Sequence, residues 1–169
     1  MGIHPVSAAA LAMWLGVAAP GLAATGSAQQ ATPSEAHAAQ VIASCAHGAP
    51  VTGSDAQGRF RACFQAGELA YVEERANGAP KGKVMRYVYE QGALVYFRTD
   101  AAPQGPGGAS AAGAATVPVT IEWTASGEVR RAVRLEHFGE VRLGADVVGA
   151  TYARGVTLAG LARAARPAP

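Results

Sequence analysis

The sequence has few of the residues that usually build an active site. Its 169 residues include only two cysteines and four histidines. The histidines lack the spacing of metal ligands, and no paired metal cysteines, phosphate loop, dinucleotide glycine motif or nucleophile elbow occurs. These absences predict a protein without catalytic residues, bound metal or cofactor.

Two short constellations suggest chemistry, but their spacing argues against it. In Cys45-Ala46-His47 the two reactive side chains are two residues apart, and partners on a helix face lie three or four apart. Glu73 and Glu74 are neighbours near the end of a predicted strand, where adjacent side chains face opposite sides. Neither pair is expected to form an acid–base or nucleophilic site.

Charge is also scarce. Charged residues make up 15% of the chain, and the formal net charge is +2. The middle of the chain is mildly basic, but acidic residues interleave with the basic ones, so we expect no nucleic-acid partner. The basic residues are Arg59, Arg61, Lys81, Lys83 and Arg86, and the interleaved acids are Glu68, Glu73, Glu74 and Glu90.

No apolar run is long enough for a typical membrane span. Val6–Ala19 is apolar but short, and Pro20-Gly21 and small residues follow it. We therefore interpret residues 1–24 as a secretory signal peptide, followed by a flexible linker at 25–31. An uncleaved anchor is the alternative, since the segment before the run has no Lys or Arg. Cleavage predicts a periplasmic or secreted protein without a stable membrane span.

The two cysteines, Cys45 and Cys63, both follow the signal peptide. An even pair in an exported protein predicts one disulfide, which stabilises a fold by about 3 kcal/mol for a loop of this length. Two buried free thiols are the alternative if the protein is not exported.

Helix signals occur at both ends of the predicted domain, residues 32–166. Thr32-Pro33-Ser34-Glu35 combines an N-cap, a first-turn proline and a capping box, and predicts the helix Pro33–His47. Near the C-terminus, apolar residues recur at helical spacing. They are Val148, Tyr152, Gly155, Leu158 and Ala162. Residues 140–152 stay open between strand and helix, since Val141 and Leu143 also fit a short strand.

Three glycines within the C-terminal helical pattern lower its helix propensity. Gly149, Gly155 and Gly160 each destabilise a helix by about 1 kcal/mol relative to alanine. The alternative is that they let the helix approach the sheet closely.

The stretch Phe60–Asp100 contains one hairpin pattern twice. FRACFQAGELAYVEE and MRYVYEQGALVYFRT both alternate around a turn, at Ala66-Gly67 and at Gln91-Gly92. The shared spacing, aromatic–x–x–Gly–x–Leu–x–Tyr, covers Phe64–Tyr71 and Tyr89–Tyr96. It resembles the hairpin units of MORN repeats, although the full glycine–aromatic signature of those repeats is missing and their function is not carried over.

Regular pairing from these turns predicts a two-sided sheet. The aromatic side comprises Phe60, Ala62, Phe64, Leu69, Tyr71, Met85, Tyr87, Tyr89, Leu94 and Tyr96. The aliphatic side comprises Cys63, Ala70, Val72, Val84, Val88, Val95 and Phe97. The disulfide then places the first helix on the aliphatic side, and the C-terminal helix is expected to cover the aromatic side.

The remaining segments complete an α+β fold. Val51–Gly58 is predicted to be a turn-rich connection, and the Ala/Gly/Pro/Ser segment 101–116 a disordered insertion. Val117–Trp123 and Glu128–Leu135 alternate as further strands, with Glu122 facing Arg131 as an exposed ion pair. We therefore expect an antiparallel meander of four to six strands built from repeated hairpins, flanked by an N-terminal and a C-terminal helix.

These features predict a non-catalytic binding or structural module of the bacterial envelope. Its partner would be a protein or an envelope component, bound through Tyr71, Tyr87, Tyr89 and Tyr96 if part of the tyrosine-rich face is exposed. A small secreted inhibitor of a hydrolase and an envelope enzyme are the alternatives.

Overall fold

The computed structural model describes residues 31–78, 83–100, 117–136 and 139–167. The predicted signal peptide (1–24), the linker up to residue 30 and the insertion 101–116 lie outside the described residues. The predictions for those segments stay predictions.

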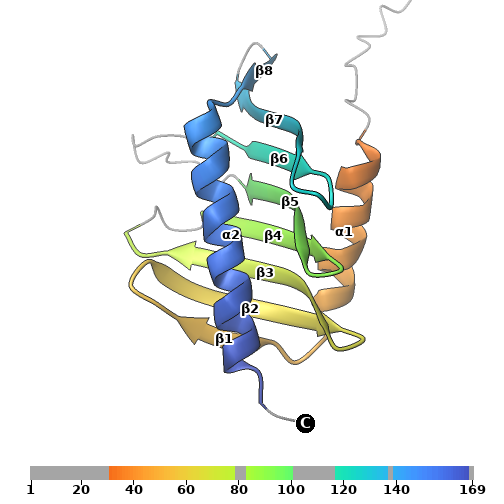
Figure 1. Cartoon of the computed structure of the whole chain (residues 1–169), viewed down its shortest axis with the longest axis vertical. Coiled ribbons are helices and arrows are strands. Elements are labelled where there is room, and N and C mark those ends of the chain that lie inside the picture. The colour runs from red at the N-terminus through yellow and green to blue at the C-terminus, as the bar shows by residue number, and fades with distance from the viewer. Residues whose placement is uncertain (1–30, 79–82, 101–116, 137–138, 168–169) are drawn as a thin grey trace, which may run out of the picture. The chain divides into compact units, whose positions relative to one another are not determined.

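The described chain forms one antiparallel sheet of eight strands, which follow one another in chain order from β1 to β8, and two helices (Figure 1). The predicted α+β class is confirmed, but four to six strands was too few. The helices are α1 (Pro33–Cys45) and α2 (Ala145–Ala165). The strands are β1 (Val51–Ser54), β2 (Gly58–Gln65), β3 (Glu68–Ala76), β4 (Val84–Glu90), β5 (Ala93–Asp100), β6 (Val119–Trp123), β7 (Val129–Glu136) and β8 (Gly139–Arg142).

Strand β1 occupies the segment predicted to be only a connection, so that prediction was wrong. The Asp55 carboxylate accepts hydrogen bonds from the backbone N–H groups of Gln57 (2.9 Å) and Gly58 (3.0 Å). This side chain closes a tight turn, because a short acidic side chain can bond the backbone two or three residues ahead. The residues on either side of the turn therefore pair as a hairpin.

The two helices pack on opposite sides of the sheet, which we call the α1 side and the α2 side. In Figure 1, α2 runs along the sheet from near β7 down to β1, whereas α1 lies along one end of the strands. The predicted capping box of α1 is confirmed: Thr32 Oγ1 accepts from the Glu35 N–H (3.1 Å) and Glu35 Oε2 from the Thr32 N–H (2.9 Å). Residues 140–152 divide into strand β8 and the start of α2.

Gly155 lets α2 approach the sheet closely. A Cβ atom at this position would lie 2.5 Å from Leu94 Cδ2, and the Gly155 carbonyl accepts a 2.8 Å hydrogen bond from the Tyr89 hydroxyl. The other two glycines, Gly149 and Gly160, have no heavy atom within 4 Å of the equivalent position. Of the two interpretations of these glycines, close packing therefore applies to Gly155.

The hairpins β2–β3, β4–β5 and β6–β7 each contain a β-bulge. The predicted turns are present, with positive φ at Ala66-Gly67 and Gln91-Gly92. Close to each turn, the second strand carries one extra residue: Ala70 in β3, Val95 in β5 and Arg130 in β7. A bulge reverses the side toward which the following residues point, relative to regular pairing.

Two hydrophobic clusters hold the helices to the sheet. The α2 side has fifteen buried members and the α1 side seven, so most of the core lies under α2. The cluster under α2 comprises Phe60, Ala62, Leu69, Val72, Tyr87, Tyr89, Leu94, Phe97, Ile121, Trp123, Ala132, Val148, Leu158, Ala159 and Ala162. The cluster under α1 comprises Ala38, Val41, Cys45, Ala70, Tyr71, Val88 and Tyr96.

Candidate functional site

The four tyrosines predicted to form a binding face do not form one. Tyr87 and Tyr89 lie under α2, and Tyr71 and Tyr96 lie under α1. Their exposed fractions are 1%, 4%, 7% and 3%, respectively. They are core residues, so a ligand has no access to a tyrosine-rich surface in this structure.

The bulges explain this correction. Phe64 pairs with Leu69 as predicted, but Cys63 pairs with Tyr71, because Ala70 is the extra residue. Tyr71 therefore lies on the α1 side, and Val72 takes the place predicted for it on the α2 side. In the second hairpin Val95 has the same effect on Tyr96 and Phe97.

The predicted disulfide is confirmed. Cys45, the last residue of α1, is bonded to Cys63 of β2, with 5.8 Å between the Cα atoms. The bond fixes the C-terminal end of α1 over the hairpin half of the strands. As a result, α1 covers the residues near the hairpin turns, whereas the other half of the α1 side carries mainly charged residues.

That other half carries a cross-strand ladder of arginines. Arg61 pairs with Glu73, Glu73 with Arg86, and Arg86 with Arg98, across four neighbouring strands. In the adjacent row on the same side, Arg59 pairs with Arg75. We call these six residues the arginine surface: Arg59, Arg61, Glu73, Arg75, Arg86 and Arg98.

Strand alternation separates charges that interleave in the sequence. Glu73 points to the α1 side, whereas its neighbour Glu74 is buried on the α2 side. Glu68 and Glu90 are at the hairpin ends of their strands, away from the ladder. The ladder itself therefore holds three arginines and one carboxylate, with Arg59 and Arg75 beside it.

Glu73 is the central carboxylate of the arginine surface. It lies 3.5 Å from the guanidinium of Arg75 and 4.0 Å from that of Arg86. The Tyr71 hydroxyl donates a 3.3 Å hydrogen bond to it from beneath α1. Burial, together with the nearby Glu73 charge, raises the pKa of Tyr71 to about 12, so this hydroxyl remains a donor at neutral pH.

Two shallow hollows flank the Arg61–Glu73 pair. The first, of about 510 Å³, lies toward the edge strand β1, and the second, of about 280 Å³, lies toward the end of α1. Arginines and uncharged residues contribute to the lining of both hollows. The first is lined by Thr52, Gly53, Ser54, Arg59, Phe60, Arg61, Glu73 and Arg75, and the second includes Ile42, Pro50, Arg61, Tyr71 and Arg86.

Two further charged clusters join the helices to the sheet. On the α2 side, Arg154 contacts the buried carboxylate of Glu74 and lies 2.6 Å from Asp55, and Tyr87 donates a 3.0 Å hydrogen bond to Glu74. Pairing with these two carboxylates raises the pKa of Arg154, so its charge is retained. These contacts satisfy buried charges, which is a structural role.

The second cluster, on the α1 side, centres on Arg131. The predicted Glu122–Arg131 pair forms, with 3.2 Å between Arg131 Nη1 and Glu122 Oε1, but the Glu122 side chain is 7% exposed instead of solvated. Arg131 also contacts Glu35 of α1 (3.1 Å) and Glu140 of β8. This cluster ties the N-terminal end of α1 to the sheet, as the disulfide ties the other end.

An apolar hollow of about 520 Å³ lies on the α2 side, between the start of α2 and strands β6–β8. Trp123 and Tyr152 form part of its lining, with their rings 5.6 Å apart. Within the described ranges, no group of three or more His, Cys, Asp or Glu residues is placed to hold a metal ion. None of the helices described here is long and apolar enough to cross a membrane.

Comparison of the chain with protein-family models, with curated proteins and with solved structures finds no match. The likeness of the hairpins to MORN units is therefore one of local pattern only. The candidate site is therefore defined by the geometry of the arginine surface alone. The sequence had indicated this surface only as a mildly basic middle segment.

Proposed function

We propose that the protein is an exported, non-catalytic binding module of the bacterial envelope, and that its arginine surface binds a phosphate-bearing envelope component. The observation that supports this proposal is the ladder Arg61–Glu73–Arg86–Arg98, with Arg59 and Arg75 beside it. Guanidinium groups match phosphate oxygens with two parallel hydrogen bonds, which a lysine cannot provide.

The spacing of the ladder favours a ligand with several phosphates. Arg61 and Arg98 are three strands apart. At about 4.8 Å between strands, they are separated by roughly 14 Å, more than one phosphate group spans. A phosphate-rich polymer or an array of lipid headgroups provides several charges over that distance.

Binding assays with two probes test the proposal and distinguish the two sources of phosphate. The first probe is soluble long-chain polyphosphate, and the second is a vesicle of phosphatidylglycerol in phosphatidylcholine. We expect at least one of them to bind the purified full chain at low salt, with an affinity that falls as salt rises. Vesicle binding alone would identify headgroups as the source, and polyphosphate binding would identify a polymer.

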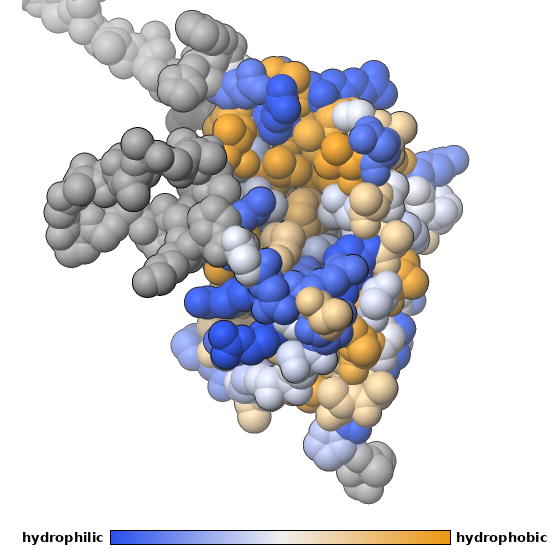
Figure 2. Space-filling view, turned by 90° about the vertical axis from the view of Figure 1, so that its left-hand side faces the viewer, coloured by the Kyte–Doolittle hydropathy of each residue, from blue (hydrophilic) through white to orange (hydrophobic). Residues whose placement is uncertain are grey.

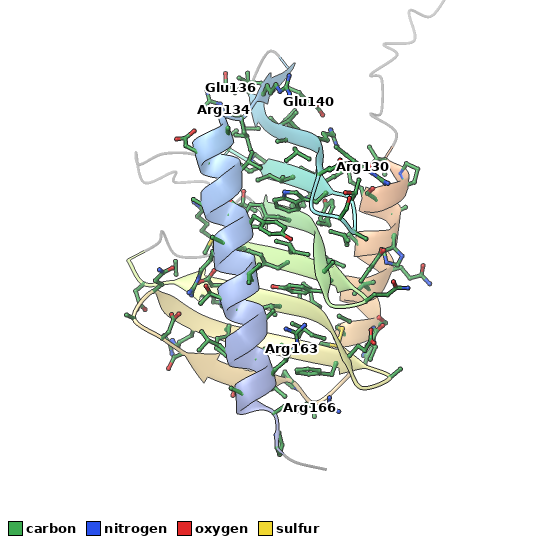
Figure 3. All side chains as sticks on the ribbon, viewed as in Figure 1. Arg130, Arg134, Glu136, Glu140, Arg163 and Arg166 are labelled. Carbon is green, nitrogen blue, oxygen red and sulfur yellow. A yellow bond between two sulfur atoms is a disulfide. The ribbon has the colours of Figure 1, made fainter. Side chains whose placement is uncertain are left out.

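Matched variants distinguish binding at the arginine surface from general electrostatic attraction between the probe and the protein. Replacing the exposed Arg59, Arg61 and Arg98 by glutamine should weaken binding at least tenfold, or about 1.4 kcal/mol. The control replaces three arginines away from the arginine surface, Arg134, Arg163 and Arg166, which Figure 3 labels. Equal losses in the two triple variants, or no binding to either probe, would refute the assignment. Hydrolase activity of the purified protein, abolished by one side-chain change, would refute the non-catalytic role.

A further inference from the structure

The two edges of the sheet differ in how they are protected. Strand β1 packs against α2, whereas all four residues of β8 are exposed. An exposed edge strand is a template for pairing with another strand, and proteins usually block it with lysine, proline or a covering segment. The sequence of β8, Gly139-Glu140-Val141-Arg142, contains neither lysine nor proline, and its two charged residues have opposite signs, so they do not repel a second copy of the same strand.

The hydrogen-bond pattern shows which backbone groups of this region face β7. The Leu143 N–H donates to the Ala132 carbonyl (2.9 Å), next to the β7–β8 ladder. Because antiparallel pairs alternate, Val141, two residues earlier, also directs its backbone groups toward β7. The backbone groups of Glu140 and Arg142 therefore point to the outer edge.

We propose that β8 pairs with β8 of a second copy of this chain, antiparallel and centred on Val141. In that register each Glu140 lies opposite Arg142 of the other copy, and the two residues exchange backbone hydrogen bonds. Opposite charges meet twice, because the strand is self-complementary under a two-fold axis. Glu140 keeps its contact with Arg131, since a carboxylate accepts several hydrogen bonds.

Exposed apolar side chains are concentrated in the part of the sheet that contains β8. Five of the six exposed large hydrophobic side chains in the described ranges lie in or next to β6–β8 and the start of α2. Figure 2 shows hydrophobic surface gathered toward this upper end of the molecule. The five are Val117, Val129, Leu135, Val141 and Val147, with exposed fractions of 37–50%.

The symmetry has a consequence for the proposed ligand site. A two-fold axis perpendicular to the sheet leaves both α1 sides facing the same way, so both arginine surfaces of the dimer can reach one polymer or one membrane. The dimer itself does not depend on that function. With only four residues per strand the contact is small, so we expect a reversible dimer.

Sedimentation of the purified full chain over a range of concentrations tests the proposal. We expect a monomer–dimer equilibrium that shifts toward monomer in Arg142→Glu, by at least tenfold in the dissociation constant, because Glu140 would then face a second carboxylate across the interface. The exchanged variant, Glu140→Arg with Arg142→Glu, restores opposite charges and should recover dimerisation. That recovery distinguishes an interface effect from damage to the Arg131 cluster, which the exchange does not repair.

A second variant tests the backbone pairing independently of charge. Arg142→Pro removes an outward N–H, at an edge position where proline is tolerated. It should abolish dimerisation while the circular dichroism spectrum of the monomer is kept. A protein that is monomeric at every concentration, or a dimer that survives both Arg142 substitutions, would overturn the proposal.

Discussion

The two sides of the sheet are built from the same strands but differ in how completely they are covered. On the α2 side one long helix crosses the strands and seals a core of fifteen buried residues, together with the charge of Glu74. On the α1 side a shorter helix covers the hairpin half and leaves five arginines on the other half. This difference is why the proposed ligand surface is placed on the α1 side, whereas the α2 side holds most of the core.

The neighbouring residues Glu73 and Glu74 provide the strongest test of this difference. Glu74 is 1% exposed and contacts Arg154, so Glu74→Ala leaves a buried charge without one of its partners and should lower the free energy of unfolding by about 3 kcal/mol. Glu73→Ala removes a partly buried carboxylate from the arginine surface, with the hydrogen bond that it accepts from Tyr71, and should lower it by less, about 1 kcal/mol. Urea denaturation of both variants measures the two values.

Substitutions of Glu73 and Glu74 should also differ in their effect on the affinity for a ligand. Because Glu73 reduces the positive charge of the arginine surface, Glu73→Ala should strengthen binding of the phosphate probe that the protein prefers. Glu74→Ala, assayed well below its unfolding midpoint, should leave it unchanged. Similar effects of both substitutions on stability would show that the two sides do not differ as described.

The disulfide is the next largest contribution, and it acts on the α1 side. Replacing both Cys45 and Cys63 by serine should lower the free energy of unfolding by about 3 kcal/mol, since it removes the restriction on an 18-residue separation in the unfolded chain. Thermal unfolding with and without a reductant checks this. The reductant should destabilise the natural sequence only; an equal shift in the double variant would show that it acts elsewhere.

Substitutions at Gly155 and Gly149 compare the face of α2 that packs on the sheet with a face that is open. Gly155→Ala places a methyl group 2.5 Å from Leu94 Cδ2 and should destabilise the fold by about 1–3 kcal/mol. Gly149→Ala meets open space and should stabilise it by up to about 1 kcal/mol through helix propensity. Unfolding midpoints that move in the same direction in the two variants would contradict the close approach of α2 at Gly155.

Local sequence signals predicted the features that local chemistry determines. The capping box at Thr32 and Glu35, the glycine turns, the helical spacing of α2 and the Cys45–Cys63 bond are all present. Each depends on a few residues close in the chain, or on a pair of cysteines with no other candidate partner. The disulfide placed the first helix on one side, and the C-terminal helix was expected on the other because that apolar side needed a cover. The structure confirms that the two helices lie on opposite sides.

The side of the sheet occupied by each tyrosine could not be predicted, because the bulges have no distinct sequence signal. Ala70 and Val95 are ordinary strand residues, yet each one changes the side of the residue that follows it. The arginine surface could not be predicted from the sequence for a related reason. Its arginines are spread over the two hairpins β2–β3 and β4–β5. They alternate with acids such as Glu74, which strand geometry directs to the other side.

The smallest expected effect is the pH dependence of the Asp55–Arg154 pair. Hydrogen bonding to Arg154 lowers the pKa of Asp55 to about 2. A carboxylate whose pKa is lower in the folded state stabilises the fold above its unfolded pKa, and loses that contribution as the pH falls from about 4 to about 2. The difference in unfolding free energy between the natural sequence and Asp55→Asn should therefore shrink over this range. In an Arg154→Gln background the pH dependence of that difference should be weaker, because the main cause of the shifted pKa is gone. An unchanged dependence in that background would assign the shift to the backbone N–H groups of Gln57 and Gly58, and would remove Asp55 from the contacts that secure α2 to the sheet.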